Sequence, residues 1–213
     1  MPEIVKLNRQ YYRDVNHFAV STPWEHGFMA FYSHLSGIGV LAILLLIAWW
    51  RARSRPKPDR QVARVLWAAG GTAIAEGISH YILKPLIAER RPYLTLAHVE
   101  VLLTRTHGFS FPSGHATIAG ATIVGLWLSR DRLMTILAAI AGVFLAFGRV
   151  YVGMHYPGDV VAGLIFGGLF VLILSPAVVG PLTRFTRAIQ RSSSIGWLVE
   201  SRRETGAHAS SRA

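Results

Sequence analysis

Three short clusters of polar residues in this chain have the types and spacing needed for phosphate chemistry. They read Lys84-x6-Arg91-Pro92, Pro112-Ser113-Gly114-His115 and Arg149-x5-His155-x3-Asp159. Together they supply three permanent cations, two imidazoles, one carboxylate and a turn that contains glycine. Such a set can hold a phosphate and attack its phosphorus through a ring nitrogen, with no metal ion required.

The second cluster opens an apolar stretch and is suited to cradling a phosphate. Ser113 can cap a helix that starts here, and Gly114 lets the backbone approach a ligand. Unpaired N–H groups and the helix dipole favour an anion at such a start. An imidazole titrates near neutrality, so His115 could protonate a leaving oxygen. Taken alone, the serine and glycine are also typical of a plain capped helix.

His155 and Asp159 are four residues apart in a turn that leads into another apolar stretch. A carboxylate that accepts a hydrogen bond from one ring nitrogen leaves the other nitrogen free as a nucleophile. The alternative is that Asp159 caps a helix and His155 lies at the membrane interface. Arg149 favours the catalytic interpretation, because an arginine in or near hydrocarbon is costly unless it serves a polar pocket.

Lys84 and Arg91 add positive charge for the oxygens of a transferring phosphoryl group. A lone lysine at a helix end could instead simply extend to the membrane surface. Glu76, His80 and Lys84 share one helical face by their spacing of four. We expect Glu76 and His80 to pair with each other or to support Lys84. A metal site is disfavoured, because no third ligand follows at a fixed spacing.

The composition indicates a membrane protein. Of the 213 residues, 52% are hydrophobic and only 15% are charged, which is too apolar for an ordinary soluble domain. The net charge of +11 does not indicate nucleic-acid binding, because the basic residues fall between apolar stretches rather than along one solvated face. The absence of cysteine excludes a disulfide framework, a thiolate nucleophile and a thiolate metal site.

The apolar stretches predict an all-α membrane helix bundle with about five transmembrane helices, near Phe28–Trp50, Val62–Leu86, Ser113–Leu128, Leu133–Val152 and Val160–Leu182. Apolar residues at helical spacing between Ile4 and Phe18 predict an N-terminal interfacial helix, and Thr22-Pro23-Trp24-Glu25 predicts a capped helix start. Residues 88–112 form a long loop with a short helix near Leu94–Leu103. Residues 1–182 then make one membrane-embedded domain, and residues 183–213 make a basic, partly disordered tail.

The distribution of Lys and Arg predicts the orientation in the membrane. Most of them lie in the loop after the first predicted span, in the loop after the third and in the tail. These segments should be cytoplasmic, and all three clusters then face the other side of the membrane. We therefore expect a multi-pass protein of the cell membrane, with an extracytoplasmic active site and a cytoplasmic C-terminus.

In order and spacing, the clusters resemble the signature motifs of the type 2 phosphatidic acid phosphatase superfamily: Lys-x6-Arg-Pro, Pro-Ser-Gly-His and Ser-Arg-x5-His-x3-Asp. The resemblance spans residues 84–159 and implies a metal-independent phosphatase with an α-helical membrane fold and no cofactor. It implies phosphate binding by Lys84, Arg91, Ser113, Gly114 and Arg149, and a phosphohistidine at His155 that is oriented by Asp159, with His115 as the acid. Gly148 departs from the pattern, which usually has serine there. This removes one hydroxyl contact without touching the nucleophile, so it bears on rate or substrate more than on class.

The implied substrate is a membrane lipid phosphate or an isoprenoid diphosphate, with its tail in the bilayer and its phosphate in the cationic mouth. Size and topology are similar to the undecaprenyl-diphosphatase branch, and phosphatidic acid or phosphatidylglycerol phosphate is the alternative substrate. A transporter that uses Glu76, His80 and Arg149 as a relay is a second class of function, disfavoured because the polar groups gather at one face and no repeat exists. A lipid-binding relative without activity is a third, against which the intact histidines argue. The oligomeric state stays open.

Overall fold

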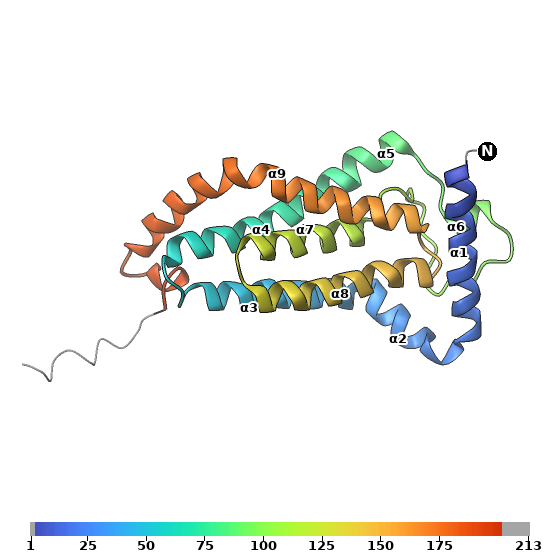
Figure 1. Ribbon diagram of the computed structural model, residues 1–213, viewed down its shortest axis with the longest axis horizontal. Coiled ribbons are helices and arrows are strands. Elements are labelled where there is room, and N and C mark those ends of the chain that lie inside the picture. The colour runs from blue at the N-terminus through green and yellow to red at the C-terminus, as the bar shows by residue number, and fades with distance from the viewer. Residues whose placement is uncertain (1–2, 202–213) are drawn as a thin grey trace, which may run out of the picture.

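The computed structural model describes residues 3–201, and this part of the chain is helical with no β-strand. Most helices run along one direction and form an elongated bundle, and α1 (Glu3–Ser21) lies across one end of it (Figure 1). The prediction of an all-α bundle is confirmed. The crossing direction of α1 is the one expected for a helix in the interfacial plane, and its membrane position stays a prediction.

Three helical stretches in the described residues are long and apolar enough to span a membrane. The first, Pro23–Ala52, is built from a 3₁₀ turn (Pro23–Glu25), α2 (His26–Phe31), a π-helical turn (Tyr32–Ser36) and α3 (Gly37–Ala52). The other two are α8 (Arg132–Tyr151) and α9 (Pro157–Gln190).

The predicted count of about five spans is not confirmed. α7 (Gly114–Leu128) is apolar but has only 15 residues. Its length of about 22 Å is less than the roughly 30 Å of a hydrocarbon core. α4 (Pro58–Ile78) has charged residues near both ends, and it continues through a second π-helical turn (Ser79–Leu83) into α5 (Lys84–Ile87).

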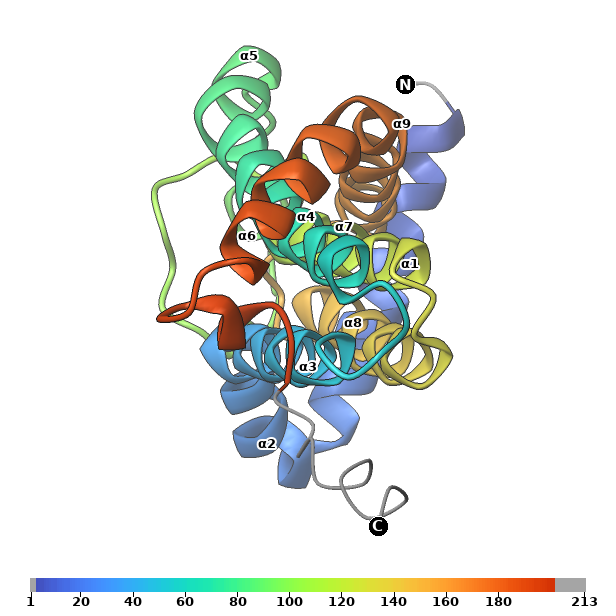
Figure 2. The same ribbon diagram turned by 90° about the vertical axis from the view of Figure 1, so that its left-hand side faces the viewer.

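α7 lies in the middle of the bundle and packs against α3, α4, α8 and α9 (Figure 2). Its contact with α9 is made between backbones. A Cβ added to Gly120 would lie 2.1 Å from the carbonyl oxygen of Leu164, and one added to Gly167 would lie 2.1 Å from that of Thr117. Small residues allow such close approach in membrane helix pairs. This contact fixes the start of α7 beside the start of α9, where the second and third clusters lie.

Two local predictions hold only in part. A helix does start at Pro23 with Thr22 as its N-cap residue, but the Thr22 side chain does not cap it. The Thr22 hydroxyl instead donates to the carbonyl of Phe18 at 2.8 Å, because α1 reaches Ser21 and its last carbonyls need donors. The short helix near Leu94–Leu103 is only α6 (Pro92–Thr95). The apolar side chains after it pack against the core from an irregular backbone, whose polar groups find partners in the reciprocal hydrogen bonds between Asn16 and Glu100, at 2.8 and 2.9 Å.

The predicted tail begins later than residue 183, because α9 continues to Gln190. After it, a 3₁₀ turn (Gly196–Leu198) folds back on α3. Trp49 Nε1 donates to the carbonyl of Leu198, and Arg53 Nη1 donates to that of Trp197, each at 3.0 Å. The remaining part of the predicted tail, residues 202–213, lies outside the described residues.

Candidate active site

The three clusters converge on one cavity of about 760 Å³. Its lining includes residues at the start of α7, near the end of α8 and in the connection that leads to α9, and these helix ends lie at the end of the bundle that α1 crosses (Figure 1). The predicted site residues that line it are Glu76, His80, Lys84, Arg91, Gly114, His115, Arg149 and His155. Ser113 and Asp159 do not line it and are fully buried behind its wall. The apolar part of the wall includes Phe31 and Leu35, which are also exposed on the outer surface of the bundle. The cavity therefore has charged residues in part of its lining and apolar residues, Phe31 and Leu35, on the side that reaches the outer surface of the bundle.

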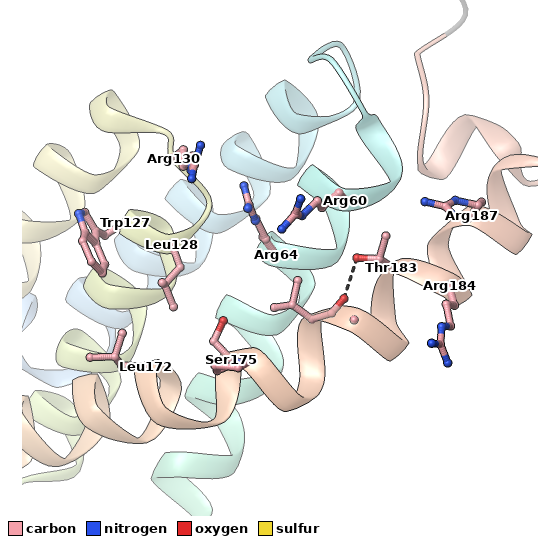
Figure 3. A pocket seen from close by; sticks show the side chains of 13 residues that line it. Arg60, Arg64, Trp127, Leu128, Arg130, Leu172, Ser175, Thr183, Arg184 and Arg187 are labelled. Carbon is pink, nitrogen blue, oxygen red and sulfur yellow. Dashed lines mark hydrogen bonds between the residues drawn. The ribbon is translucent and has the colours of Figure 1, made fainter.

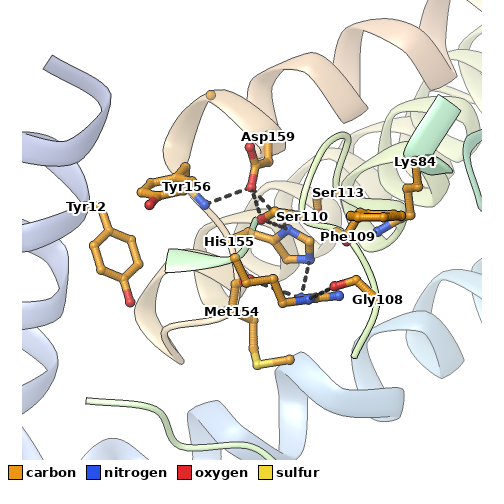
Figure 4. A network of polar contacts seen from close by, with 12 residues as sticks. Tyr12, Lys84, Gly108, Phe109, Ser110, Ser113, Met154, His155, Tyr156 and Asp159 are labelled. Atoms are coloured by element: carbon orange, nitrogen blue, oxygen red, sulfur yellow. Dashed lines mark hydrogen bonds and ion pairs between the residues drawn. The ribbon is translucent and has the colours of Figure 1, made fainter. Parts of the chain in front are cut away.

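His155 lies in the short connection between α8 and α9 and is 2% exposed. Its Nδ1 lies 3.3 Å from Asp159 Oδ2, and its Nε2 lies 3.4 Å from Arg91 Nη1 (Figure 4). A guanidinium can only donate, so Nε2 must accept and Nδ1 carries the proton. Burial lowers the pKa of His155 well below its usual value, and the charges of Arg149, Arg91 and Lys84 lower it further. The ring is thus neutral, with its lone pair on Nε2.

Asp159 holds this ring from the first turn of α9. Its Oδ2 accepts from Ser110 Oγ at 2.5 Å and from the Tyr156 backbone N–H at 2.9 Å, besides the contact with His155. Ser110 is fully buried and its hydroxyl is also 3.4 Å from His155 Nδ1. Ser110 belongs to the loop before the second cluster and was missed in the sequence, because a serine outside a motif gives no signal.

The three cations are buried and fixed by carbonyl groups. Lys84, Arg91 and Arg149 are 8%, 7% and 5% exposed. Arg91 donates to the carbonyls of Gly108 at 2.8 Å and Met154 at 3.0 Å, and Lys84 donates to a neighbouring loop carbonyl at 3.2 Å. None of the three forms an ion pair with a carboxylate in residues 3–201. Buried charges normally have a counter-charge, so this arrangement suits an incoming anion.

The π-helical turn Tyr32–Ser36 supplies two main-chain acceptors that no sequence motif indicates. Arg149 Nη1 donates to the carbonyl of Ser33, and His115 Nε2 lies 2.7 Å from the carbonyl of His34. A carbonyl can only accept, so Nε2 of His115 carries a proton and Nδ1 is left for a substrate. A π turn shifts carbonyls out of the regular helical ladder and is frequent at functional sites.

Ser113 is the N-cap residue of α7 but its hydroxyl makes no capping bond, contrary to the capping expected from the sequence. Its Oγ is buried with no hydrogen-bond partner, while its backbone N–H donates to the Asp159 carbonyl at 3.0 Å. Gly114 faces Glu76, since an added Cβ would lie 2.5 Å from Glu76 Oε1. The start of α7 therefore has an unused hydroxyl, and the space beside Gly114 is taken by the Glu76 carboxylate.

Glu76 and His80 do not pair in the way expected from their spacing. Glu76 Oε2 is buried without a hydrogen-bond partner, and the His80 ring packs edge to face with Tyr81 at 4.8 Å between centroids. Both still line the cavity, so a supporting role stays a prediction. Within the described residues, no group of three His, Asp or Glu side chains is arranged to hold a metal ion.

The chain is also similar in sequence and fold to known proteins. Residues 64–180 match the PAP2 superfamily. An undecaprenyl-diphosphatase of Sulfolobus acidocaldarius is 28% identical over 193 residues, which are 87% of this chain and 86% of that protein. A lipid A 1-phosphatase of Rhizobium etli is 38% identical over 155 residues, covering 65% of this chain and 66% of that protein.

One solved structure shows the same fold. It is the crystal structure of a transmembrane PAP2 type phosphatidylglycerolphosphate phosphatase from Bacillus subtilis, which superposes with a TM-score of 0.60. The alignment covers 90% of each chain at 21% sequence identity. The family resemblance inferred from the three clusters is confirmed, and so is the membrane character of the chain.

Proposed function

The chain belongs to the PAP2 superfamily, and we propose that it hydrolyses the phosphate monoester or diphosphate of a membrane lipid, with undecaprenyl diphosphate as the favoured substrate. One observation carries this proposal: three buried cations, which have no carboxylate partner within residues 3–201, line the same cavity as a buried, neutral histidine, whose unprotonated nitrogen lies 3.4 Å from one of them, Arg91. The cations can bind the oxygens of a phosphate, and the free ring nitrogen can attack its phosphorus.

The first step is attack by His155. The terminal phosphate lies among Lys84, Arg91 and Arg149, whose N–H groups replace the water that solvated its oxygens. The Nε2 lone pair forms a bond to phosphorus, and the bond from phosphorus to the lipid-side oxygen breaks. Asp159 accepts from Nδ1–H and stabilises the positive charge that develops on the ring.

In this proposal, His115 donates a proton to the leaving oxygen in the first step and accepts a proton from water in the second. Burial and the charge of Arg149 lower the pKa of His115 to about 3, so we propose that the ring gains its second proton when the phosphate anion binds beside it. Nε2–H then donates to the His34 carbonyl and Nδ1–H protonates the leaving oxygen. Water then attacks the phosphohistidine, His115 takes a proton from it, and the bond between Nε2 and phosphorus breaks. Inorganic phosphate leaves and His155 returns to its neutral form. The three cations balance the charge of the phosphoryl group, so the reaction needs no metal ion.

The lipid is proposed to enter past Phe31 and Leu35, from the extracytoplasmic leaflet. Undecaprenyl diphosphate is favoured because a relative that aligns with 87% of this chain is an undecaprenyl-diphosphatase. The orientation rests on the arginines at the opposite end of the bundle. Because the chain has no cysteine, single cysteines at Lys57 and Arg105 can be labelled cleanly. We expect an impermeant reagent to label only the second in intact cells, and labelling only of the first would reverse the orientation.

The deciding experiment is phosphate release by the purified protein in detergent with EDTA. The substrates are undecaprenyl diphosphate, phosphatidic acid, phosphatidylglycerol phosphate and lipid A, compared by kcat/KM. We expect undecaprenyl diphosphate to be hydrolysed best, and His155→Ala to abolish release from every substrate. His17→Ala is the matched control, because His17 is exposed on α1. Activity in the His155→Ala protein would refute the phosphohistidine intermediate. A loss of activity in EDTA that magnesium restores would refute the metal-free mechanism.

A further inference from the structure

A second cavity of about 830 Å³ lies at the end of the bundle opposite the active site, between α4, α7 and the second half of α9 (Figure 3). Arg60 lines it and Glu76 lines the catalytic cavity, and the two residues are roughly 24 Å apart along α4 at the helical rise. Five arginines line this second cavity, here called the arginine cavity, and no lining residue is acidic: Arg60, Arg64, Arg130, Arg184 and Arg187.

Most of this charge is uncompensated. Asp59 pairs with Arg187 at 2.9 Å, and Asp131 pairs with Arg51 at 2.8 Å and Arg55 at 2.9 Å. These nearby carboxylates are therefore occupied. No ion pair within residues 3–201 involves the other four arginines of the cavity, which are Arg60, Arg64, Arg130 and Arg184.

The backbone is irregular at two places around the arginine cavity. Arg130 follows α7 with φ of 60°, in the left-handed region where glycine is the easiest residue to place. Pro176 and Pro181 lie inside α9, which curves visibly in Figure 1. A proline lacks the N–H that would bond the carbonyl four residues earlier, so it bends the helix. A preference for arginine on the cytoplasmic side explains their number, but not their convergence from three elements on one cavity.

Besides the five arginines, the lining of the arginine cavity contains apolar side chains. It includes Trp127, Leu128, Leu172 and Val179, and Trp127 is 60% exposed. We propose that this cavity binds the phosphate-bearing headgroup of an anionic phospholipid, with the acyl chains along the apolar wall. Arginine binds phosphate oxygens through two parallel N–H groups. Basic pockets between membrane helices suit such headgroups. The apolar wall favours a lipid over free phosphate.

The test measures binding by native mass spectrometry of the full chain in neutral detergent. The probes are phosphatidylglycerol, phosphatidylcholine with the same acyl chains, and inorganic phosphate. Phosphatidylglycerol carries a phosphodiester rather than a terminal phosphate, so it is not a substrate of the proposed hydrolysis. We expect it to bind more tightly than phosphatidylcholine. The double variant Arg64→Gln/Arg130→Gln should weaken it roughly 30-fold, from about 1 kcal/mol per basic residue.

Two further variants control for folding and for general charge. Arg132→Gln removes an exposed basic residue at the start of α8 that does not line the arginine cavity, and it should bind phosphatidylglycerol like the wild type. Arg184→Gln changes only an exposed side chain of α9 and should give a smaller loss. The proposal would be overturned if the double variant bound phosphatidylglycerol as tightly as the wild type, or if Arg132→Gln lost as much affinity as the double variant. It would also be overturned if the wild type bound phosphatidylcholine as tightly as phosphatidylglycerol, or if millimolar inorganic phosphate displaced phosphatidylglycerol. None of these outcomes bears on the phosphatase chemistry.

Discussion

Gly167 tests whether the contact between α7 and α9 positions the active site. A Cβ at this position would lie 2.1 Å from the carbonyl oxygen of Thr117 and 2.9 Å from its carbonyl carbon. These are backbone atoms, so no side-chain rotation can make room. Carbon and oxygen atoms normally approach to no less than about 3.3 Å. In Gly167→Ala the two helices must therefore move apart locally by about 1 Å.

This movement changes the site because each helix carries part of it. His115 and Ser113 lie at the start of α7, Asp159 lies at the start of α9, and the Ser113 N–H donates to the Asp159 carbonyl at 3.0 Å. A misplacement of about 1 Å can cost on the order of 100-fold in rate. Overpacking of this kind costs about 1–3 kcal/mol of stability, which most folded domains tolerate. We expect a folded Gly167→Ala protein whose kcat is lower by about 100-fold.

The assay is phosphate release at saturating lipid substrate, together with thermal unfolding in the same detergent. Gly70→Ala is the matched control: Gly70 is exposed on α4 and an added Cβ meets nothing within 4 Å. It should keep its activity and gain up to about 1 kcal/mol of helix stability. Wild-type kcat in Gly167→Ala would show that this backbone contact does not set the geometry. An equal loss in Gly70→Ala would show that the effect does not come from the helix contact.

Three further predictions concern single groups of the site. Ser110→Ala removes the shortest hydrogen bond of Asp159, 2.5 Å, and should lower kcat about tenfold with KM unchanged, whereas exposed Ser21→Ala should have no effect. Arg149→Lys should lower kcat/KM by about 100-fold or more, because a lysine ammonium lacks the planar pair of N–H donors that binds two phosphate oxygens while another N–H bonds the Ser33 carbonyl. Normal turnover in this variant would contradict that role. The lowered pKa of His155 means that the unfolded chain binds a proton which the folded chain does not. Folded stability should therefore fall as the pH drops below about 6.5, and His155→Gln should flatten this slope in melting temperature.

Much of the site was predictable because its charged groups fall in three short clusters, each with a characteristic internal spacing. The spacing of His155 and Asp159 is one helical turn, and the structure does bring Nδ1 to within 3.3 Å of the carboxylate. The apolar stretches likewise predicted the helices. Their membrane-spanning count was less predictable, because hydropathy cannot tell a full span from a helix such as α7 that is short and surrounded by protein.

The other parts of the site had no sequence signal. The acceptors of Arg149 and His115 are main-chain carbonyls, which every residue has, and they reach the site through a π turn that no hydrophobic period encodes. The contact of Ser110 with Asp159 depends on how a long loop folds over α9. Such contacts follow only from tertiary packing, so they must be read from the structure.

Gly148 shows why a motif position has to be judged by the space around it. A Cβ there would lie 2.2 Å from Ser33 Oγ, so the hydroxyl of Ser33 already occupies the space into which a side chain at 148 would project. Ser33 is fully buried, its hydroxyl has no hydrogen-bond partner, and its carbonyl accepts from Arg149. A hydroxyl therefore stands beside Arg149 although it comes from the first membrane helix rather than from α8. The Ser33 hydroxyl fits there because residue 148 is a glycine, and a side chain at position 148 would force this hydroxyl to turn away.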